Sequence, residues 1–219
     1  MAANSSGPRE SPARALWRGA RRWAIRRREE AGDRNLGIET MGPRRTLSAT
    51  RDLRNKPYEP LPYAGLRRIG ETLAPGPEDV IYDLGCGKGR VVCWFARRPV
   101  AKVVGVEYDP ALADAARANL AALRGAQALV EIRTGDAVTE DYSRATVVML
   151  YNPFGATLMR EVLENLSRSL DDKPRRLRIV YASPAHEEVF KAFPRFRETE
   201  RFSIPYDLGK MAVVVYDGR

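Results

Sequence analysis

The chain has 219 residues, of which 44% are hydrophobic and 30% are charged, as in an ordinary globular protein. That length suits one domain with an appendage. No apolar run approaches the roughly 18 residues of a membrane span, and the N-terminus lacks the apolar core of a secretory signal. The composition therefore excludes a transmembrane segment and predicts a cytoplasmic protein.

Cysteine and histidine are too few for a metal cluster. The chain has two cysteines, Cys86 and Cys93, and a single histidine, His186. Their spacing matches no zinc site. We therefore expect no metal, and two thiols kept in a reducing compartment.

The positive charge is concentrated at the N-terminus. Residues 1–56 hold 14 Lys and Arg against 6 Asp and Glu, a net of +8, whereas the remainder holds 23 against 22, a net of +1. After a polar lead over residues 1–12, residues 13–31 predict a basic amphipathic helix. Such a helix could bind anionic lipid, nucleic acid or an acidic partner, or pack its tryptophans on the domain or on a second subunit. Residues 32–57 are predicted to be loop-like, and residues 1–56 to form an extension of a domain over 57–219.

The central feature of the domain is a glycine-rich stretch. An apolar run ends at Asp83, glycines follow at 85, 87 and 89, and Arg90 opens an apolar-periodic segment. This pattern predicts a strand, a tight turn and a helix. The next apolar run, 102–107, ends in Glu107, and a carboxylate at that strand tip can accept hydrogen bonds from a ribose diol. Because the glycines follow G-x-G-x-G and not G-x-G-x-x-G, the spacing favours an adenosyl ligand without a pyrophosphate.

The rest of the domain alternates helices and strands. An apolar-periodic helix through Leu66, Ile69 and Leu73 precedes the glycine stretch, and helices are predicted over 110–123, 156–170 and 185–193. Further strands are predicted over 128–133, 145–151, 178–182, 196–204 and 211–216. Only a short connection separates the last two, which indicates an antiparallel hairpin. The pattern predicts an α/β, Rossmann-like, seven-stranded, mostly parallel sheet with helices on both faces.

Polar residues follow four successive strands of this predicted sheet. They are Asp83, Glu107, Asp136 and Asn152. Because ligands bind outside the carboxyl ends of parallel strands, these side chains are expected to share one rim.

These motifs resemble a known family. The stretch Asp83-Leu-Gly-Cys-Gly-Lys-Gly89 with Glu107 is similar to the cofactor motifs of class I S-adenosylmethionine-dependent methyltransferases. The resemblance implies S-adenosylmethionine as cofactor and S-adenosylhomocysteine as product. It also implies that the segment before the first strand closes over the cofactor, with Tyr63 a better candidate than Tyr58. The implied cofactor-binding residues are Tyr58, Glu59, Tyr63, Asp83, Gly85, Cys86, Gly87, Glu107, Tyr108, Asp136, Ala137 and Asn152.

A second motif concerns the methyl acceptor. Asn152-Pro-Phe154 resembles the Asp/Asn-Pro-Pro-aromatic motif of methyltransferases that act on amino groups, although it lacks the second proline. The Asn152 side-chain oxygen and the Pro153 carbonyl can accept the N–H groups of an amine, and Phe154 can stack on a substrate or face a cation. We therefore predict Asn152, Pro153 and Phe154 as catalytic residues.

The tyrosine-bearing segment, the glycine stretch and Tyr151-Asn-Pro-Phe154 together are similar to bacterial relatives of the non-SET histone-lysine methyltransferases. The resemblance implies methyl transfer to an amine nitrogen of a protein or peptide, a lysine or a terminal amine. A nucleic-acid or small-molecule amino group is the alternative acceptor. A module that binds the adenosyl ligand without catalysis, tethered by its basic arm, is the alternative of another class. The sequence leaves the acceptor, the number of methyl groups and the oligomeric state open.

Overall fold

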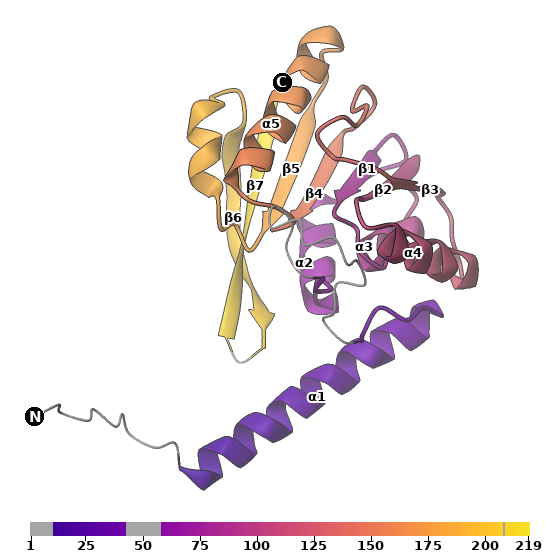
Figure 1. Cartoon of the computed structure of the whole chain (residues 1–219), viewed down its shortest axis with the longest axis vertical. Coiled ribbons are helices and arrows are strands. Elements are labelled where there is room, and N and C mark those ends of the chain that lie inside the picture. The colour runs from indigo at the N-terminus through magenta and orange to yellow at the C-terminus, as the bar shows by residue number, and fades with distance from the viewer. Residues whose placement is uncertain (1–10, 43–57, 208) are drawn as a thin grey trace, which may run out of the picture.

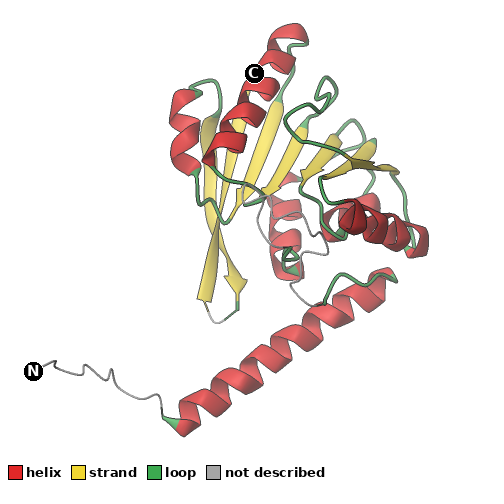
Figure 2. Ribbon diagram, viewed as in Figure 1, coloured by secondary structure: helices red, strands yellow, loops and turns green. Residues whose placement is uncertain are grey.

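The computed structural model describes residues 11–42, 58–207 and 209–219, and these form a twisted sheet with helices on both faces (Figures 1 and 2). The strands are β1 (Val80–Leu84), β2 (Lys102–Glu107), β3 (Leu129–Thr134), β4 (Val147–Tyr151), β5 (Leu177–Ala182), β6 (Arg197–Tyr206) and β7 (Gly209–Gly218). The helices are α1 (Pro12–Leu36), α2 (Tyr63–Leu73), α3 (Arg90–Ala96), α4 (Pro110–Ala122), α5 (Ala156–Asp172) and the 3₁₀ helix η1 (Glu187–Ala192).

The seven described strands lie in the order β3-β2-β1-β4-β5-β7-β6. Strands β1 to β5 run parallel, while β7 is antiparallel to both β5 and β6. The predicted fold class and its C-terminal hairpin are confirmed. The hairpin strands reach Tyr206 and start again at Gly209, so they are longer than predicted, and η1 is a 3₁₀ helix where the periodicity suggested an ordinary short helix.

Two apolar layers flank the sheet. One contains the buried faces of α2, α3 and α4, and the other those of α5 and η1. The central strands β1 and β4 are apolar almost throughout, because both of their faces meet helices. Parallel strands between two helical layers bring all their carboxyl ends to one edge, which is where a ligand site forms in such folds.

Helix α1 is longer than the sequence suggested. It begins after Ser11, continues through Gly32 and ends at Gly37, whose left-handed φ of 81° closes the last turn. Glycine weakens a helix interior, but a side chain at Gly32 would meet the ring of Tyr63 at 2.2 Å. Packing against α2 therefore compensates for the glycine, and the expected loop starts five residues later than predicted.

The burial of α1 changes along its length. Side chains of residues 13–28 are exposed apart from half-buried Ile25, whereas Glu29, Asp33 and Leu36 are buried. Leu36 and the following Ile38 belong to the hydrophobic layer of α2 and α3. The second half of α1 is thus part of the domain core. The predicted boundary at residue 56 lies outside the described residues. No helix in the described ranges is long and apolar enough to cross a bilayer.

Candidate active site

A pocket of about 950 Å³ opens at the carboxyl edge of the sheet. Its size is in the range of small-molecule sites. Its walls come from the ends of β1 to β5, from the segment before α2 and from the β6–β7 hairpin. Eleven of the residues predicted from sequence line it: Tyr58, Glu59, Gly85, Gly87, Glu107, Tyr108, Asp136, Ala137, Asn152, Pro153 and Phe154.

The glycine turn is shaped by backbone conformation. Gly85, Gly87 and Gly89 have φ values of 73°, 54° and 79°, which L side chains rarely adopt. A Cβ on Gly87 would lie 2.3 Å from the Tyr58 ring, so that ring packs directly on the turn. The turn is therefore a bare backbone surface covered by an aromatic ring.

Glu107 ties the turn to the end of β2. One carboxylate oxygen accepts the N–H of Gly87 at 2.7 Å, and the other accepts the N–H of Asp109 at 2.9 Å. Each oxygen keeps a second lone pair for another donor. Glu107 is thus held in a fixed orientation at the pocket wall, where it can accept two hydroxyl groups of a ligand.

Asp83 and Cys86 lie behind the pocket surface and do not line it. Asp83 is 3% exposed, and its Oδ2 has no hydrogen-bond partner among the described residues. Burial, and then the nearby Glu107 charge, raise the pKa of Asp83 to about 8. Burial also raises the pKa of the Cys86 thiol, which keeps it protonated and inert. A buried carboxyl of this kind favours a positively charged ligand.

Tyr63 does not contribute to the pocket. Its ring is buried at the start of α2, its hydroxyl donates to Asp33 at 2.6 Å and its backbone N–H donates to Glu29 at 3.1 Å. The expectation that Tyr63 is the closing tyrosine is therefore corrected in favour of Tyr58. Burial raises the pKa of Tyr58, so its hydroxyl remains a donor, and it binds the carbonyl of Thr40 at 2.9 Å.

A buried ionic network that the sequence did not reveal lies next to the glycine turn. Arg90, the first residue of α3, is 2% exposed. It donates to Glu29 and to the Thr40 hydroxyl, both at 2.6 Å, and its third nitrogen lies 3.2 Å from Asp33. Glu29 and Asp33 are four residues apart on α1, which places both carboxylates on one helix face. That spacing is the feature of the sequence that could have indicated a buried ionic site. Their partner Arg90, however, is about 60 residues away in the sequence.

Asn152 combines strain with an unused acceptor. Its φ is 41°, in the left-handed region, and its buried Oδ1 has no hydrogen-bond partner among the described residues. Such strain persists only where the surroundings impose it, and it concentrates at functional sites. Pro153 packs against the glycine turn, because a Cβ on Gly85 would lie 2.7 Å from the Pro153 Cβ. The acceptor motif and the glycine turn are therefore in contact.

The hairpin supplies a wall that the sequence did not identify. Tyr206, Lys210, Met211 and Ala212 line the pocket, together with Ser183 after β5. The Tyr206 hydroxyl donates to the Glu59 carboxylate and so joins the hairpin to the segment before α2. No strand-end motif marks these residues, because they reach the pocket only through the hairpin's length.

The residues present fit S-adenosylmethionine. The fit rests on the unpartnered Asp83 oxygen, the spare lone pairs of Glu107 and the side-chain-free turn. Glu107 suits the ribose of that cofactor, and Asp136 and Ala137 line the same pocket, whereas Asp83 lies behind the pocket surface and can act on the positively charged end of the cofactor only through its charge. No group of three or more metal-ligating side chains occurs in the part of the chain that the structure describes.

Solved structures share this architecture. An RNA methyltransferase from Salinibacter ruber, in complex with S-adenosyl-L-homocysteine, aligns with a TM-score of 0.55 and 29% identity over 73% of this chain and 93% of its own. A TehB-like SAM-dependent methyltransferase from Corynebacterium glutamicum ATCC 13032 aligns with a TM-score of 0.51 over 72% and 89% of the two chains, and at 18% identity it supports the fold alone. The chain therefore has the Rossmann-like fold of class I S-adenosylmethionine-dependent methyltransferases, and it is similar in sequence to a member of that class that binds S-adenosyl-L-homocysteine.

Within this class, residues 83–185 match the ANTKMT methyltransferase domain. A protein-lysine N-methyltransferase from Saccharolobus islandicus (strain REY15A) is 36% identical over 96 residues, which are 43% of this chain. The matched part is 59% of that relative, so the chain spans less than two thirds of its length.

Proposed function

We propose that this chain transfers the methyl group of S-adenosylmethionine to the amine nitrogen of a protein lysine. The observation that carries the proposal is Asn152, a pocket-lining residue with a left-handed backbone and a buried side-chain oxygen that has no hydrogen-bond partner among the described residues. The curated relative that acts on protein lysine supports the choice of acceptor. The site residues predicted from sequence remain part of this proposal.

The chain's own residues would position the amine. Asn152 Oδ1 and the Pro153 carbonyl accept its N–H groups, which aims the nitrogen lone pair and stabilises the positive charge that develops on it. When bound, the cofactor would supply a sulfonium methyl group to that nitrogen, the electron pair of the broken S–C bond would stay on sulfur, and one N–H proton would pass to solvent. No strong base is needed when the amine arrives neutral.

The acceptor can be identified with cofactor labelled in the methyl group. We expect label from the enzyme and a host lysate to enter material that protease removes and nuclease does not, and hydrolysis to yield methyl-lysine. Nuclease-sensitive label would instead favour a nucleic-acid amino group; the Salinibacter protein is an RNA methyltransferase. Absence of any label would favour the non-catalytic module.

Asn152→Ala tests the role of the asparagine. We expect methyl transfer to fall by about 100-fold or more, the usual scale for losing a group that stabilises developing charge, with cofactor affinity nearly unchanged. Asn165→Ala is the matched control, because Asn165 lies on α5 outside the pocket and its amide donates to the carbonyls of Val138 and Glu140. Complete loss of cofactor binding by Asn152→Ala would contradict the acceptor role.

A further inference from the structure

The first half of α1 makes little contact with the domain. We call residues 11–28 the arm. In Figure 1 α1 crosses below the domain and its N-terminal half extends beyond the helices that cover the sheet. The arm carries seven arginines and no acidic residue. Its large apolar side chains are left in solvent: Leu16 is 75% exposed, Trp17 57% and Trp23 63%.

Most of the arm's apolar residues share one face, and Ala15 and Ile25 lie outside it. At about 100° per residue, roughly a third of the helix circumference holds the six that share this face. We call this face the apolar stripe: Ala13, Leu16, Trp17, Ala20, Trp23 and Ala24. Six of the seven arginines lie outside this sector, and Arg27 is within it. The arm is therefore amphipathic: the apolar stripe occupies one side, and the arginines are spread over the rest of the circumference.

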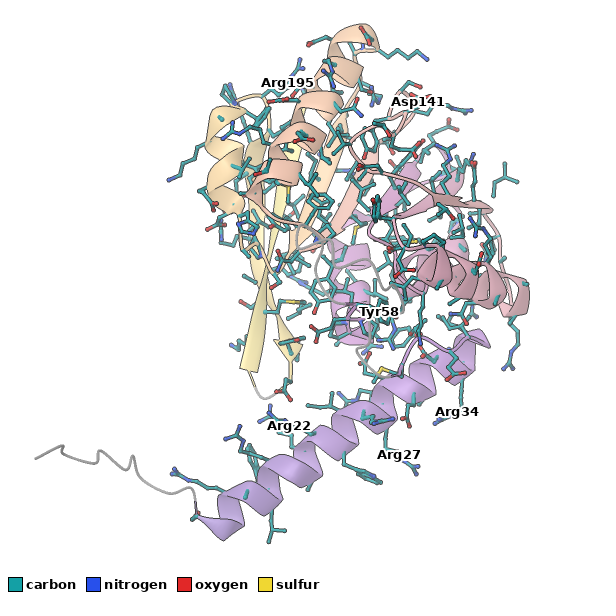
Figure 3. The ribbon with its side chains drawn as sticks, in the orientation of Figure 1. Arg22, Arg27, Arg34, Tyr58, Asp141 and Arg195 are labelled. Carbon is teal, nitrogen blue, oxygen red and sulfur yellow. The ribbon has the colours of Figure 1, made fainter. Side chains whose placement is uncertain are left out.

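The apolar stripe faces away from the domain. On the opposite side of the helix, Arg22 pairs with Asp207 of the hairpin turn at 3.2 Å, Ile25 is half-buried and Glu29 is buried. Figure 3 shows Arg22 on the side of α1 toward the domain and Arg27 on the other side. These contacts between α1 and the domain fix the rotation of α1 about its axis. In that rotation the apolar stripe lies on the outer surface of the protein.

Arginine and tryptophan are paired along the arm. The Arg21 guanidinium lies 5.2 Å from the centre of the Trp17 ring, and that of Arg27 lies 5.1 Å from the centre of the Trp23 ring. Indole rings favour the boundary between headgroups and acyl chains, and flanking arginines bind lipid phosphates. Arg27, the single arginine within the stripe, is compatible with a position at this boundary, because its long side chain can extend to the lipid phosphates.

We infer that the arm lies flat on an anionic lipid bilayer, with the apolar stripe in the interface and the catalytic domain on the water side. A nucleic acid would use the arginines but leave Leu16, Trp17 and Trp23 exposed to water. A second copy would bring two stripes together with their flanking arginines, and like charges would repel. Only a surface that is both apolar and anionic satisfies the two faces at once. The hairpin wall of the pocket, tied to the arm through Asp207, would then be close to that surface.

The test is sedimentation of the full chain with vesicles. We expect binding to vesicles of equimolar phosphatidylcholine and phosphatidylglycerol, weak binding to phosphatidylcholine alone, and a blue shift of tryptophan emission on binding. The stripe variant Trp17→Ser/Trp23→Ser and the charge variant Arg14→Glu/Arg21→Glu should each lower the partition coefficient by about tenfold or more. Arg160→Glu/Arg168→Glu, the same charge change on exposed positions of α5, should leave binding within about twofold because these sites are remote from the stripe.

Three results would overturn the inference. The first is that the protein does not bind anionic vesicles, whether or not it binds RNA. The second is vesicle binding that survives loss of both tryptophans. The third is an equal effect of the α5 charge variant, which would indicate a general response to net charge. Circular dichroism of each variant checks that the fold is intact, and cofactor binding should be unchanged because the arm does not touch the pocket.

Discussion

The buried pair between Glu29 and Arg90 makes a specific prediction about stability. Glu29 is 7% exposed and its carboxylate accepts from Arg90 at 2.6 Å and from the Tyr63 N–H at 3.1 Å. Glu29→Ala leaves a buried guanidinium and a buried N–H short of an acceptor, and breaking a buried pair in this way costs about 3–5 kcal/mol. Against a total of about 5–15 kcal/mol, this should lower the melting temperature by roughly 6–20 °C.

The neighbouring residue is the matched control. Glu30 pairs with Arg26 at 2.8 Å on the exposed surface, where the Arg26 side chain is 67% exposed. Glu30→Ala should cost only about 0.3–0.5 kcal/mol. Equal melting temperatures for Glu29→Ala and Glu30→Ala, measured by calorimetry, would refute the account of α1 as part of the core.

Three further predictions concern the pocket. Between about pH 4 and 8, Asp83 holds a proton in the folded protein but releases it in the unfolded chain. The free energy of unfolding of the ligand-free protein should therefore fall as pH rises. Urea titrations of Asp83→Asn should show a weaker pH dependence. A cationic cofactor favours the Asp83 carboxylate, so calorimetry should detect proton release on binding and an affinity that rises toward pH 8, and a pH-independent affinity would contradict this. Gly87→Ala should weaken cofactor binding by about tenfold or more, because the new Cβ strains a φ of 54° and displaces the Tyr58 ring; unchanged affinity would argue against this geometry.

The sequence was sufficient where a feature depends on local pattern. The glycine turn requires positive φ at fixed positions, and the polar strand ends share a rim because parallel strands share a direction. Glu107 and Asn152 could therefore be placed at the pocket from spacing alone. The same reasoning failed at Tyr63, because spacing does not specify whether Tyr58 or Tyr63, five residues apart in the sequence, faces the ligand. That choice depends on Asp33, which takes the Tyr63 hydroxyl into the core.

Features that depend on distant partners could not be predicted. Gly32 indicates a loop by propensity, and only the ring of Tyr63 packed against it explains why α1 continues. In the same way Arg90 looks like an ordinary first residue of a helix after a glycine turn. Its burial follows from two carboxylates on α1, and the composition of the N-terminal segment, dominated by exposed arginines, conceals them.

The two halves of α1 are connected through Asp33. Its carboxylate accepts the N–H of Thr40 at 2.7 Å and the Thr40 hydroxyl at 2.8 Å, and it lies 3.2 Å from Arg90. The carbonyl of Thr40 in turn accepts the hydroxyl of Tyr58, whose ring covers Gly87. The residue that covers the cofactor turn is therefore positioned by the helix that also presents the apolar stripe. The contacts therefore run from α1 through Thr40 to Tyr58 and the glycine turn, so the helix that presents the apolar stripe also helps to support one wall of the pocket.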